Sequence, residues 1–222
     1  MSALDLYTYF RSSCAYRVRI ALNLKSLAYE PKLVHLLRGG GEQHGGDYLR
    51  LNPQGLIPTL VDGEVVLTQS LAIIEYLEEI HPTPPLLPAR PEHRAYVRAL
   101  AQIIGCDIHP LNNLRVLNYL RERLGHDEDA IRNWCRNWIS IGLEAFEKWL
   151  QKQQHQSLFC FGDTPTLADV CLVPQIYNAR RVGCDLSGLP IAMRIATHCL
   201  NLEPFRRAAP EQQPDSADEN RN

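Results

Sequence analysis

The chain has 222 residues, of which 45% are hydrophobic and 22% charged, and its formal net charge is −2. This composition is typical of a globular protein with one large or two small domains, and the charge gives no attraction to nucleic acid or to an anionic membrane. No segment approaches the apolar length that spans a bilayer, and the first residues lack the pattern of a secretory signal. We therefore expect a cytoplasmic protein with neither nucleic-acid nor membrane partners.

Seven cysteines are scattered along the chain without a C-x-x-C pair, and the eight histidines show no spacing typical of metal ligands. An odd, scattered set of cysteines favours reduced thiols over a disulfide framework or a zinc site. We expect no metal. Cys14 is the one cysteine whose setting, at the start of a predicted helix, would lower the pKa of its thiol.

A strand over residues 4–9 and a helix over residues 15–25 are predicted from their apolar periodicity. The polar turn between them holds Ser12, Ser13 and Cys14, and the nearby Arg11, Arg17 and Arg19 raise the local positive potential. The first N–H groups of a helix lack partners and carry the positive end of its dipole, so an anion, and in particular a thiolate, is stabilised there. An ordinary N-cap serine is the alternative explanation.

A small α/β domain is predicted for the first 80 or so residues. Residues 29–36 read as a second strand, and the glycine-rich stretch 39–46 reads as a flexible loop without a phosphate-loop motif. Pro58 precedes a strand whose partner returns after an Asp-Gly turn, which predicts a hairpin. A helix follows over residues 71–81, with Ser70 as its N-cap.

The second half of the chain is predicted to be helical. Five prolines in residues 82–91 indicate a linker, and helices are expected over 92–124, with a break at Pro110, and around 131–149. Thr166 and Asp169 form a capping-box pattern for a further helix. The predicted division is a first domain at 1–83, a linker at 84–91, a helical domain at 92–211 and a flexible tail at 212–222.

Taken together, this order of elements, the Ile-Pro before the hairpin and the Gln-Ser at a helix start resemble the cytosolic glutathione S-transferases. Residues 12–22, Ser-Ser-Cys-Ala-Tyr-Arg-Val-Arg-Ile-Ala-Leu, resemble the signature of the zeta class. Residues 69–79 and 82–88 are similar to the maleylacetoacetate isomerases of that class. Segments 107–115 and 172–181 resemble the bacterial maleylacetoacetate and maleylpyruvate isomerases.

The resemblance implies a thioredoxin-like N-terminal domain followed by an all-α C-terminal domain, glutathione as the cofactor, and a homodimer. The implied activity is the glutathione-dependent cis–trans isomerisation of maleylacetoacetate to fumarylacetoacetate, in tyrosine and phenylalanine catabolism. One alternative is a maleylpyruvate isomerase of gentisate catabolism. The other is a protein of the same fold that acts as a thiol oxidoreductase through Cys14, or as a binding protein.

The resemblance also assigns roles to residues. Ser12 would hold the glutathione sulfur as a thiolate, with Ser13 and Cys14 in support. Pro58 would be cis and leave the Ile57 main chain to pair with glutathione, which further residues would also bind: Gln43, Gln69, Ser70 and His109. The substrate's carboxylate and keto oxygens would be bound by three arginines: Arg11, Arg115 and Arg181.

Overall fold

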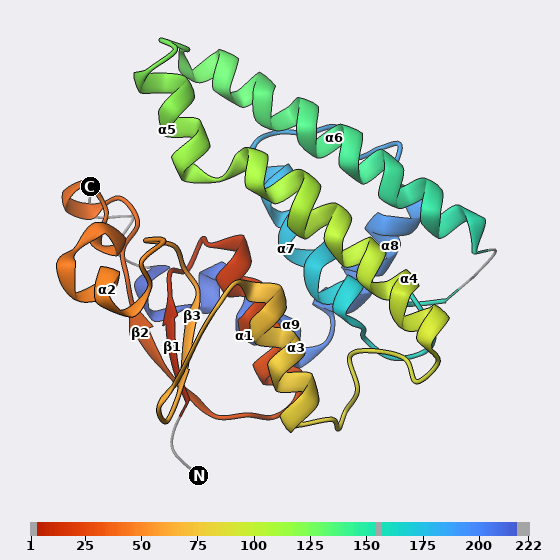
Figure 1. The fold of residues 1–222 in the computed structure, drawn as a ribbon. Helices are drawn as coiled ribbons and strands as arrows, with labels where there is room; N and C mark the ends of the chain where they lie inside the picture. The colour runs from red at the N-terminus through yellow and green to blue at the C-terminus, as the bar shows by residue number, and fades with distance from the viewer. Residues whose placement is uncertain (1–3, 154–156, 217–222) are drawn as a thin grey trace. The chain divides into compact units, whose positions relative to one another are not determined.

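The computed structural model describes residues 4–153 and 157–216. The chain forms two compact units (Figure 1), the first made by the chain up to Leu86 and again from Asn201, the second by Leu87–Leu200. The predicted linker, 84–91, brackets the observed boundary at Leu86. The return of the chain to the first unit after Leu200 differs from the prediction, which placed residues 92–211 in the helical domain.

The first unit is built on a four-stranded sheet of order β2-β1-β3-β4. Strands β1 and β2 are parallel, whereas β1 with β3 and β3 with β4 are antiparallel. The predicted strands, hairpin and two longer helices are confirmed. The elements in chain order are β1 (Leu4–Thr8), α1 (Ser13–Leu24), β2 (Tyr29–Leu33), α2 (Gly46–Leu51), β3 (Thr59–Asp62), β4 (Val65–Thr68), α3 (Ser70–Ile80) and α9 (Glu203–Ala208).

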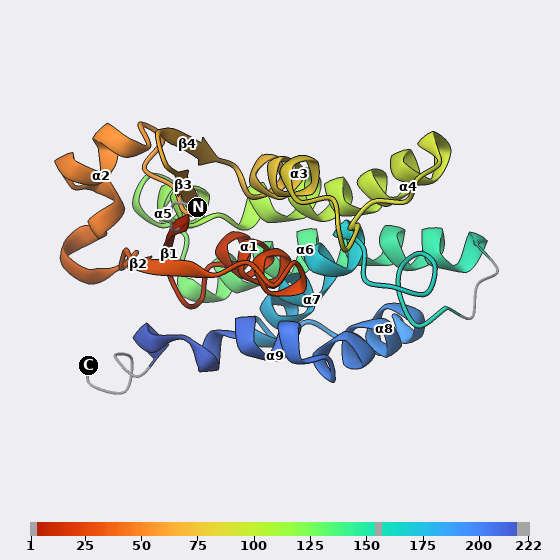
Figure 2. The same ribbon diagram turned by 90° about the horizontal axis from the view of Figure 1, so that it is seen from below.

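Helices cover both faces of this sheet. Figures 1 and 2 show α1 and α3 along one face and α2 on the other. The alternating burial of β1 reflects its period of two, and Leu6, Leu60 and Leu77 are fully buried between sheet and helices. The glycine-rich stretch, predicted as a flexible loop, forms two 3₁₀ turns, Arg38–Gly40 and Glu42–His44, and then α2, which the sequence pattern does not reveal.

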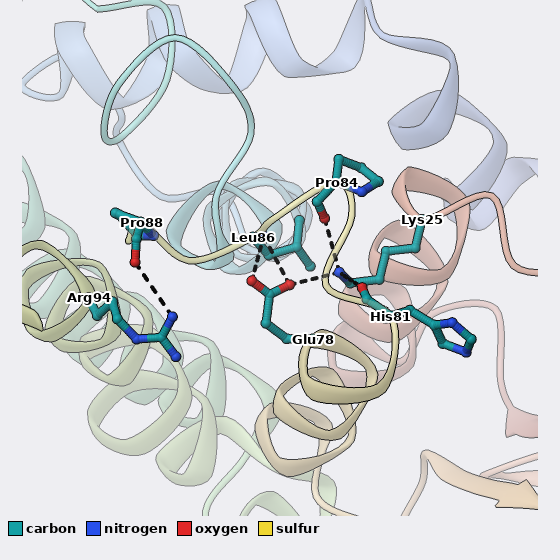
Figure 3. Close-up of polar contacts among 7 residues, drawn as sticks. All are labelled: Lys25, Glu78, His81, Pro84, Leu86, Pro88 and Arg94. Carbon is teal, nitrogen blue, oxygen red and sulfur yellow. Dashed lines mark hydrogen bonds and ion pairs between the residues drawn. The ribbon is translucent and has the colours of Figure 1, made fainter. Parts of the chain in front are cut away.

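A buried ion pair between Lys25 and Glu78 holds the proline-rich segment that follows α3 (Figure 3). The Lys25 ammonium lies 2.7 Å from the Glu78 carboxylate and donates to the carbonyls of His81 and Pro84 at 2.6 and 3.0 Å. The Glu78 carboxylate also accepts the N–H of Leu86 at 3.0 Å. The start of the linker is therefore held in place by charge-assisted hydrogen bonds.

The second unit is helical. Its central helix is α7, which packs against α4 and α8 and is buried along most of its length. The elements are α4 (Pro91–Gln102), a π turn (Ile103–Ile108), a 3₁₀ turn (His109–Asn112), α5 (Leu114–Glu122), α6 (Glu128–Lys152), α7 (Leu167–Arg181) and α8 (Pro190–Leu200).

Two sequence signals are confirmed in the second unit. The helix predicted over 92–124 breaks at Pro110, which has no N–H to continue the helical ladder, although the interruption extends over both the π and 3₁₀ turns. Gly142 of α6 allows Ile108 to pack closely there, because a Cβ at this glycine would clash with the Ile108 side chain. Thr166 and Asp169 form the expected capping box, and Asp169 also accepts the Cys160 N–H at 2.8 Å.

The predicted flexible tail is wrong for residues 212–216. Helix α9 packs against α1, and a 3₁₀ turn, Pro210–Gln212, leads to Gln213 and Asp215, whose side chains are buried. The polar composition suggested fraying, but these polar side chains hydrogen-bond to main-chain groups of the first unit. The remainder of the predicted tail, 217–222, lies outside the described residues.

Across residues 4–153 and 157–216, no helix combines the length and apolarity needed to cross a membrane. Over the same residues, no three His, Cys, Asp or Glu side chains come together as metal ligands. All seven cysteines are free thiols.

Candidate active site

The turn before α1 places Ser12 at the N-cap of that helix. The Ser12 side-chain oxygen accepts the Ala15 N–H at 3.2 Å, and the Ser12 N–H donates to the Tyr9 carbonyl at 3.0 Å. Capping uses a lone pair of the hydroxyl oxygen, so the hydroxyl hydrogen remains available to donate to a second group. Ser12, Ser13 and Cys14 are all half-buried. The N-cap and the thiolate-binding interpretations of Ser12 are therefore compatible.

The start of α3 is the second polar helix N-terminus of the first unit. The prediction that Ser70 is its N-cap is wrong: Gln69 occupies the cap, and Ser70 is the first helical residue, only 5% exposed. Gln69 has a φ of 68°, a left-handed conformation that non-glycine residues rarely adopt and that is enriched at functional sites. Its exposed side chain donates to Gln54 at 2.9 Å. The surrounding structure thus imposes a strained backbone where this helix begins.

Arg17, one of the arginines expected to raise the positive potential of this turn, brings these two helix N-termini together, a contact that the sequence does not predict. Its Nη1 lies 3.7 Å from the Cys14 Sγ and 3.4 Å from the Ser70 Oγ. The side chain is 1% exposed, and its Nε and Nη2 have no hydrogen-bond partner among the described residues. A buried guanidinium with two unsatisfied N–H groups is costly unless an anion compensates it. The sequence signal for its burial is its position between apolar residues of the predicted helix.

A turn from Leu56 to Thr59 supplies main-chain groups to the same unit. The Ile57-Pro58 peptide bond is cis, as predicted. Tyr48 of α2 and Asn52 hold the carbonyl of Leu56 at 2.6 and 2.7 Å, and the Tyr48 hydroxyl is also 2.9 Å from the Thr59 hydroxyl. Burial raises the pKa of Tyr48, so it is a neutral hydroxyl. Within the described part of the chain, the main chain of Ile57 makes no hydrogen bond, which leaves it able to pair with an extended ligand.

Two more predicted site residues lie in the first unit. Gln43 is 4% exposed, donates to the Leu36 carbonyl at 3.4 Å, and has a side-chain oxygen with no hydrogen-bond partner among the described residues. The guanidinium of Arg11 donates to the Tyr9 hydroxyl at 3.3 Å and lies 5.2 Å from the centre of the Phe10 ring. The first unit thus carries two polar helix N-termini, the buried guanidinium of Arg17 and the cis-proline turn at Ile57.

The remaining predicted site residues, His109, Arg115 and Arg181, belong to the second unit. His109 begins the 3₁₀ turn and is half-buried, whereas Arg115 is exposed and donates its N–H to the side chain of the α5 N-cap, Asn113. Arg181 is exposed at the end of α7 and donates to Asn178 at 2.9 Å. None of the contacts among the described residues joins these three side chains to one another.

Comparisons with known proteins agree with this arrangement. The family model for the N-terminal domain of glutathione S-transferases matches residues 11–80. A probable maleylacetoacetate isomerase of Vibrio cholerae is 51% identical over 97% of this chain and 100% of its own. The holo structure of a maleylpyruvate isomerase, a bacterial zeta-class enzyme, has a TM-score of 0.92 at 52% identity, covering 95% of this chain and 99% of that one.

A further solved structure carries ligands. A maleylacetoacetate isomerase of Methylobacterium extorquens, with bound malonate and glutathione, has a TM-score of 0.91 at 42% identity and covers 95% of this chain and 98% of its own. Such identity over nearly the whole length of each chain establishes common descent and a common fold. The chain therefore belongs to the zeta class of the glutathione S-transferases, the class of the maleylacetoacetate and maleylpyruvate isomerases.

Proposed function

We propose that this protein is a glutathione-dependent cis–trans isomerase that converts maleylacetoacetate to fumarylacetoacetate. The observation that carries the proposal is the contact of Arg17 with both Cys14 and Ser70, because it unites two helix N-termini into one electropositive site. A tripeptide that bears a thiol and a carboxylate fits such a pair of sites. The maleylacetoacetate isomerases among its relatives support the choice of substrate.

The residues of the first unit fit glutathione. Ser70 and Gln69, at the start of α3, would bind the γ-glutamyl carboxylate, and the two unsatisfied N–H groups of Arg17 add positive charge nearby. The Ile57 main chain would pair with the cysteinyl backbone, while Gln43 would meet the glycyl end. Bound glutathione would supply a thiolate nucleophile that adds reversibly to the substrate's double bond and so permits rotation about it.

Ser12 would donate a hydrogen bond to the sulfur and keep it ionised, aided by the dipole of α1. Ser13 and Cys14 would support this role from the same turn. Among the residues of the second unit, His109 would contribute a polar contact to glutathione. No general base is required, because addition and expulsion of a thiolate need no proton transfer at carbon.

Arginines would bind the substrate. Arg11, Arg115 and Arg181 would take its carboxylate and keto oxygens, since the planar guanidinium forms paired hydrogen bonds with such groups. A cation at the keto oxygen also stabilises the negative charge that develops when the thiolate adds, an effect of about 3 to 4 kcal/mol per donor in comparable sites. The same cations serve any diketo acid of similar length.

Maleylpyruvate is the second candidate substrate, favoured by the 52% identity and the TM-score of 0.92 to a maleylpyruvate isomerase. Steady-state kinetics with both diketo acids, each with and without glutathione, distinguish the two. We expect the higher kcat/KM with maleylacetoacetate and no turnover without glutathione. A higher kcat/KM for maleylpyruvate would reverse the assignment, and turnover independent of glutathione would overturn both.

The thiol oxidoreductase alternative depends on Cys14 as the nucleophile. If the isomerase proposal is correct, Cys14→Ala should retain most isomerase turnover, because the nucleophile belongs to glutathione. Loss of isomerase turnover in Cys14→Ala, with glutathione still bound, would instead show that isomerisation depends on the Cys14 thiol.

We also propose that the protein is a cytoplasmic homodimer. Seven free thiols suit a reducing compartment, and exposed apolar side chains such as Val65 and Val66 on β4 offer surface to a second copy. Sedimentation equilibrium at micromolar concentration should give twice the 25.2 kDa mass of one chain. A single 25.2 kDa species would contradict the dimer.

A further inference from the structure

The peptide groups of Phe10, just before the candidate active-site turn, are held on both sides by buried charged groups. The Phe10 N–H donates to the Asp215 Oδ2 at 2.9 Å, and the Phe10 carbonyl accepts from the Arg19 Nη2 at 3.0 Å. Phe10 and Asp215 are each 5% exposed, and Arg19 is fully buried. The main chain two residues before Ser12 is thus fixed by one carboxylate and one guanidinium.

Arg19 also hydrogen-bonds to the two residues before Phe10. Its Nη1 donates to the Thr8 hydroxyl at 3.0 Å and to the Tyr9 carbonyl at 3.3 Å, and the same Tyr9 carbonyl accepts the Ser12 N–H. Burial lowers the pKa of Arg19 to about 10, so the group is cationic at neutral pH. The stretch from Thr8 to Ser12 is therefore one hydrogen-bonded turn whose position depends on both charged groups.

Asp215 reaches this turn because the chain returns to the first unit after Leu200. Helix α9 is anchored on α1, where the Arg19 Nε donates to the Ala208 carbonyl at 3.0 Å and the Asn23 side chain donates to the Pro204 carbonyl at 2.9 Å. After α9, the Gln213 side chain donates to the carbonyls of Arg207 and Ala209, both at 2.9 Å. These bonds turn the chain so that the carboxylate two residues later meets Phe10.

We propose that Asp215 is a positioning residue for the isomerase site: by holding the Phe10 N–H, it fixes the turn that presents Arg11 and Ser12. The inference rests on the proposed function for its catalytic consequence, but not for the contact itself. Removal of the acceptor leaves a buried N–H unsatisfied, and the turn must move to find another partner. Even a small displacement of Ser12 would weaken its hydrogen bond to the thiolate.

The test compares full-length Asp215→Ala, Asp215→Asn and the control Glu30→Gln, which removes one exposed carboxylate of the same unit on β2. Three measurements are made: steady-state kinetics for kcat and KM, the pKa of the bound glutathione thiol from its ultraviolet thiolate absorbance, and hydrogen exchange of the Phe10 amide. Asp215→Ala should lower kcat about tenfold, the effect of one unsatisfied buried donor, and raise the thiol pKa. Asp215→Asn, whose amide oxygen still accepts, should fall between wild type and Asp215→Ala in all three, and Glu30→Gln should match wild type.

Several outcomes overturn the proposal. One is a folded Asp215→Ala protein with the wild-type thiol pKa and the wild-type exchange rate at Phe10. Another is an Asp215→Asn protein as impaired as Asp215→Ala, because charge rather than the hydrogen bond would then be responsible. If Asp215→Ala does not fold, Asp215→Asn decides the matter: faster Phe10 exchange with a raised thiol pKa supports the proposal, and wild-type values for both contradict it.

Failure of the proposed function gives a different result. A wild-type protein that binds glutathione but isomerises neither diketo acid refutes the function, whereas the Phe10 exchange rate still tests whether Asp215 holds the turn.

Discussion

Arg17 and Ser70, 53 residues apart in the sequence, meet in the buried interior of the first unit, where the Arg17 Nη1 lies 3.4 Å from the Ser70 Oγ. This contact joins α1 and α3 at their N-termini, the ends at which both helices carry partial positive charge. The Arg17 guanidinium adds a third positive group between the two helix N-termini. Its burial is energetically unfavourable when no anion is bound and favourable beside an anion. The pair is thus better suited to binding than to stabilising the fold.

The first prediction is that Arg17→Met weakens glutathione binding without destabilising the protein. A buried, incompletely satisfied charge contributes little to stability, and replacing such a group by an apolar one is often neutral or stabilising. Isothermal titration should show a Kd for glutathione raised about tenfold or more, which corresponds to the loss of one charge-assisted hydrogen bond.

Arg19→Met is the matched comparison for Arg17→Met. Arg19 is equally buried and lies two residues along the same helix, but its guanidinium donates to Thr8, Tyr9, Phe10 and Ala208. We expect Arg19→Met to lower the melting temperature strongly, because four acceptors lose their donor. A similar fall in melting temperature for Arg17→Met, with unchanged glutathione affinity, would make Arg17 structural.

The sequence alone predicts the secondary-structure elements and caps that depend on local residue pattern. Strand alternation, helical spacing and the Asp-Gly turn predicted the order of the α/β elements, and the Thr166–Asp169 spacing predicted a capping box that is confirmed. Helix α2 escaped detection because it spans only six residues and follows a run of glycines. A periodic signal needs more turns than that helix has.

The missed features depend on contacts between distant residues. Gln69 adopts a positive φ although its side chain does not favour one, so tertiary structure rather than local preference shifts the start of α3 by one residue. Asp215 contacts Phe10 across 205 residues, and Arg17 contacts Ser70 across 53. A polar tail and a charged helix residue look solvent-exposed until the partner is known.

The second prediction concerns Ser12. Ser12→Ala should remove most isomerase turnover while glutathione still binds, because the variant lacks the hydroxyl that stabilises the thiolate. Loss of the N-cap oxygen should also cost about 1 kcal/mol of stability. The pKa of the bound glutathione thiol, from ultraviolet absorbance, should rise in the variant; an unchanged value would remove Ser12 from this role.

A second N-cap variant controls for the capping effect of Ser12→Ala. Asp127 caps α6 and accepts the Ala130 N–H at 2.8 Å, so Asp127→Ala also loses a cap but changes no proposed site residue. It should lose stability to a similar degree, by about 1 kcal/mol, and retain wild-type turnover. Equal loss of turnover in both variants would attribute the Ser12 effect to helix fraying.

The third prediction is that the Lys25–Glu78 ion pair is essential to the stability of the first unit. Glu78→Gln leaves a fully buried ammonium without its counter-ion, and breaking such a pair costs about 3 to 5 kcal/mol. The half-exposed pair of Lys32 with Asp5, 3.5 Å apart in the same unit, is the control, and Asp5→Asn should cost at most about 1 kcal/mol. Urea denaturation measures both, and equal midpoints for the two variants would contradict the prediction.

The fourth prediction separates a substrate role of Arg181 from a structural one. Arg181 lies in the last turn of α7, where a cation is stabilised by the helix dipole, and it donates to Asn178 at 2.9 Å. Arg180 is its matched control, since it is also exposed and occupies the same helix end.

If Arg181 binds the distal acyl group of the diketo acid, Arg181→Ala should raise the KM for that substrate about tenfold or more, the effect of a lost charge-assisted hydrogen bond. The resemblance to zeta-class enzymes implies chlorinated acetic acids as small alternative substrates, and these lack a distal group. Their KM should stay unchanged, and Arg180→Ala should alter neither value. A structural arginine would instead lower the melting temperature and raise both KM values together, because the whole end of α7 would loosen. A selective change in KM at an unchanged melting temperature would assign Arg181 to substrate binding, and a uniform change would exclude it.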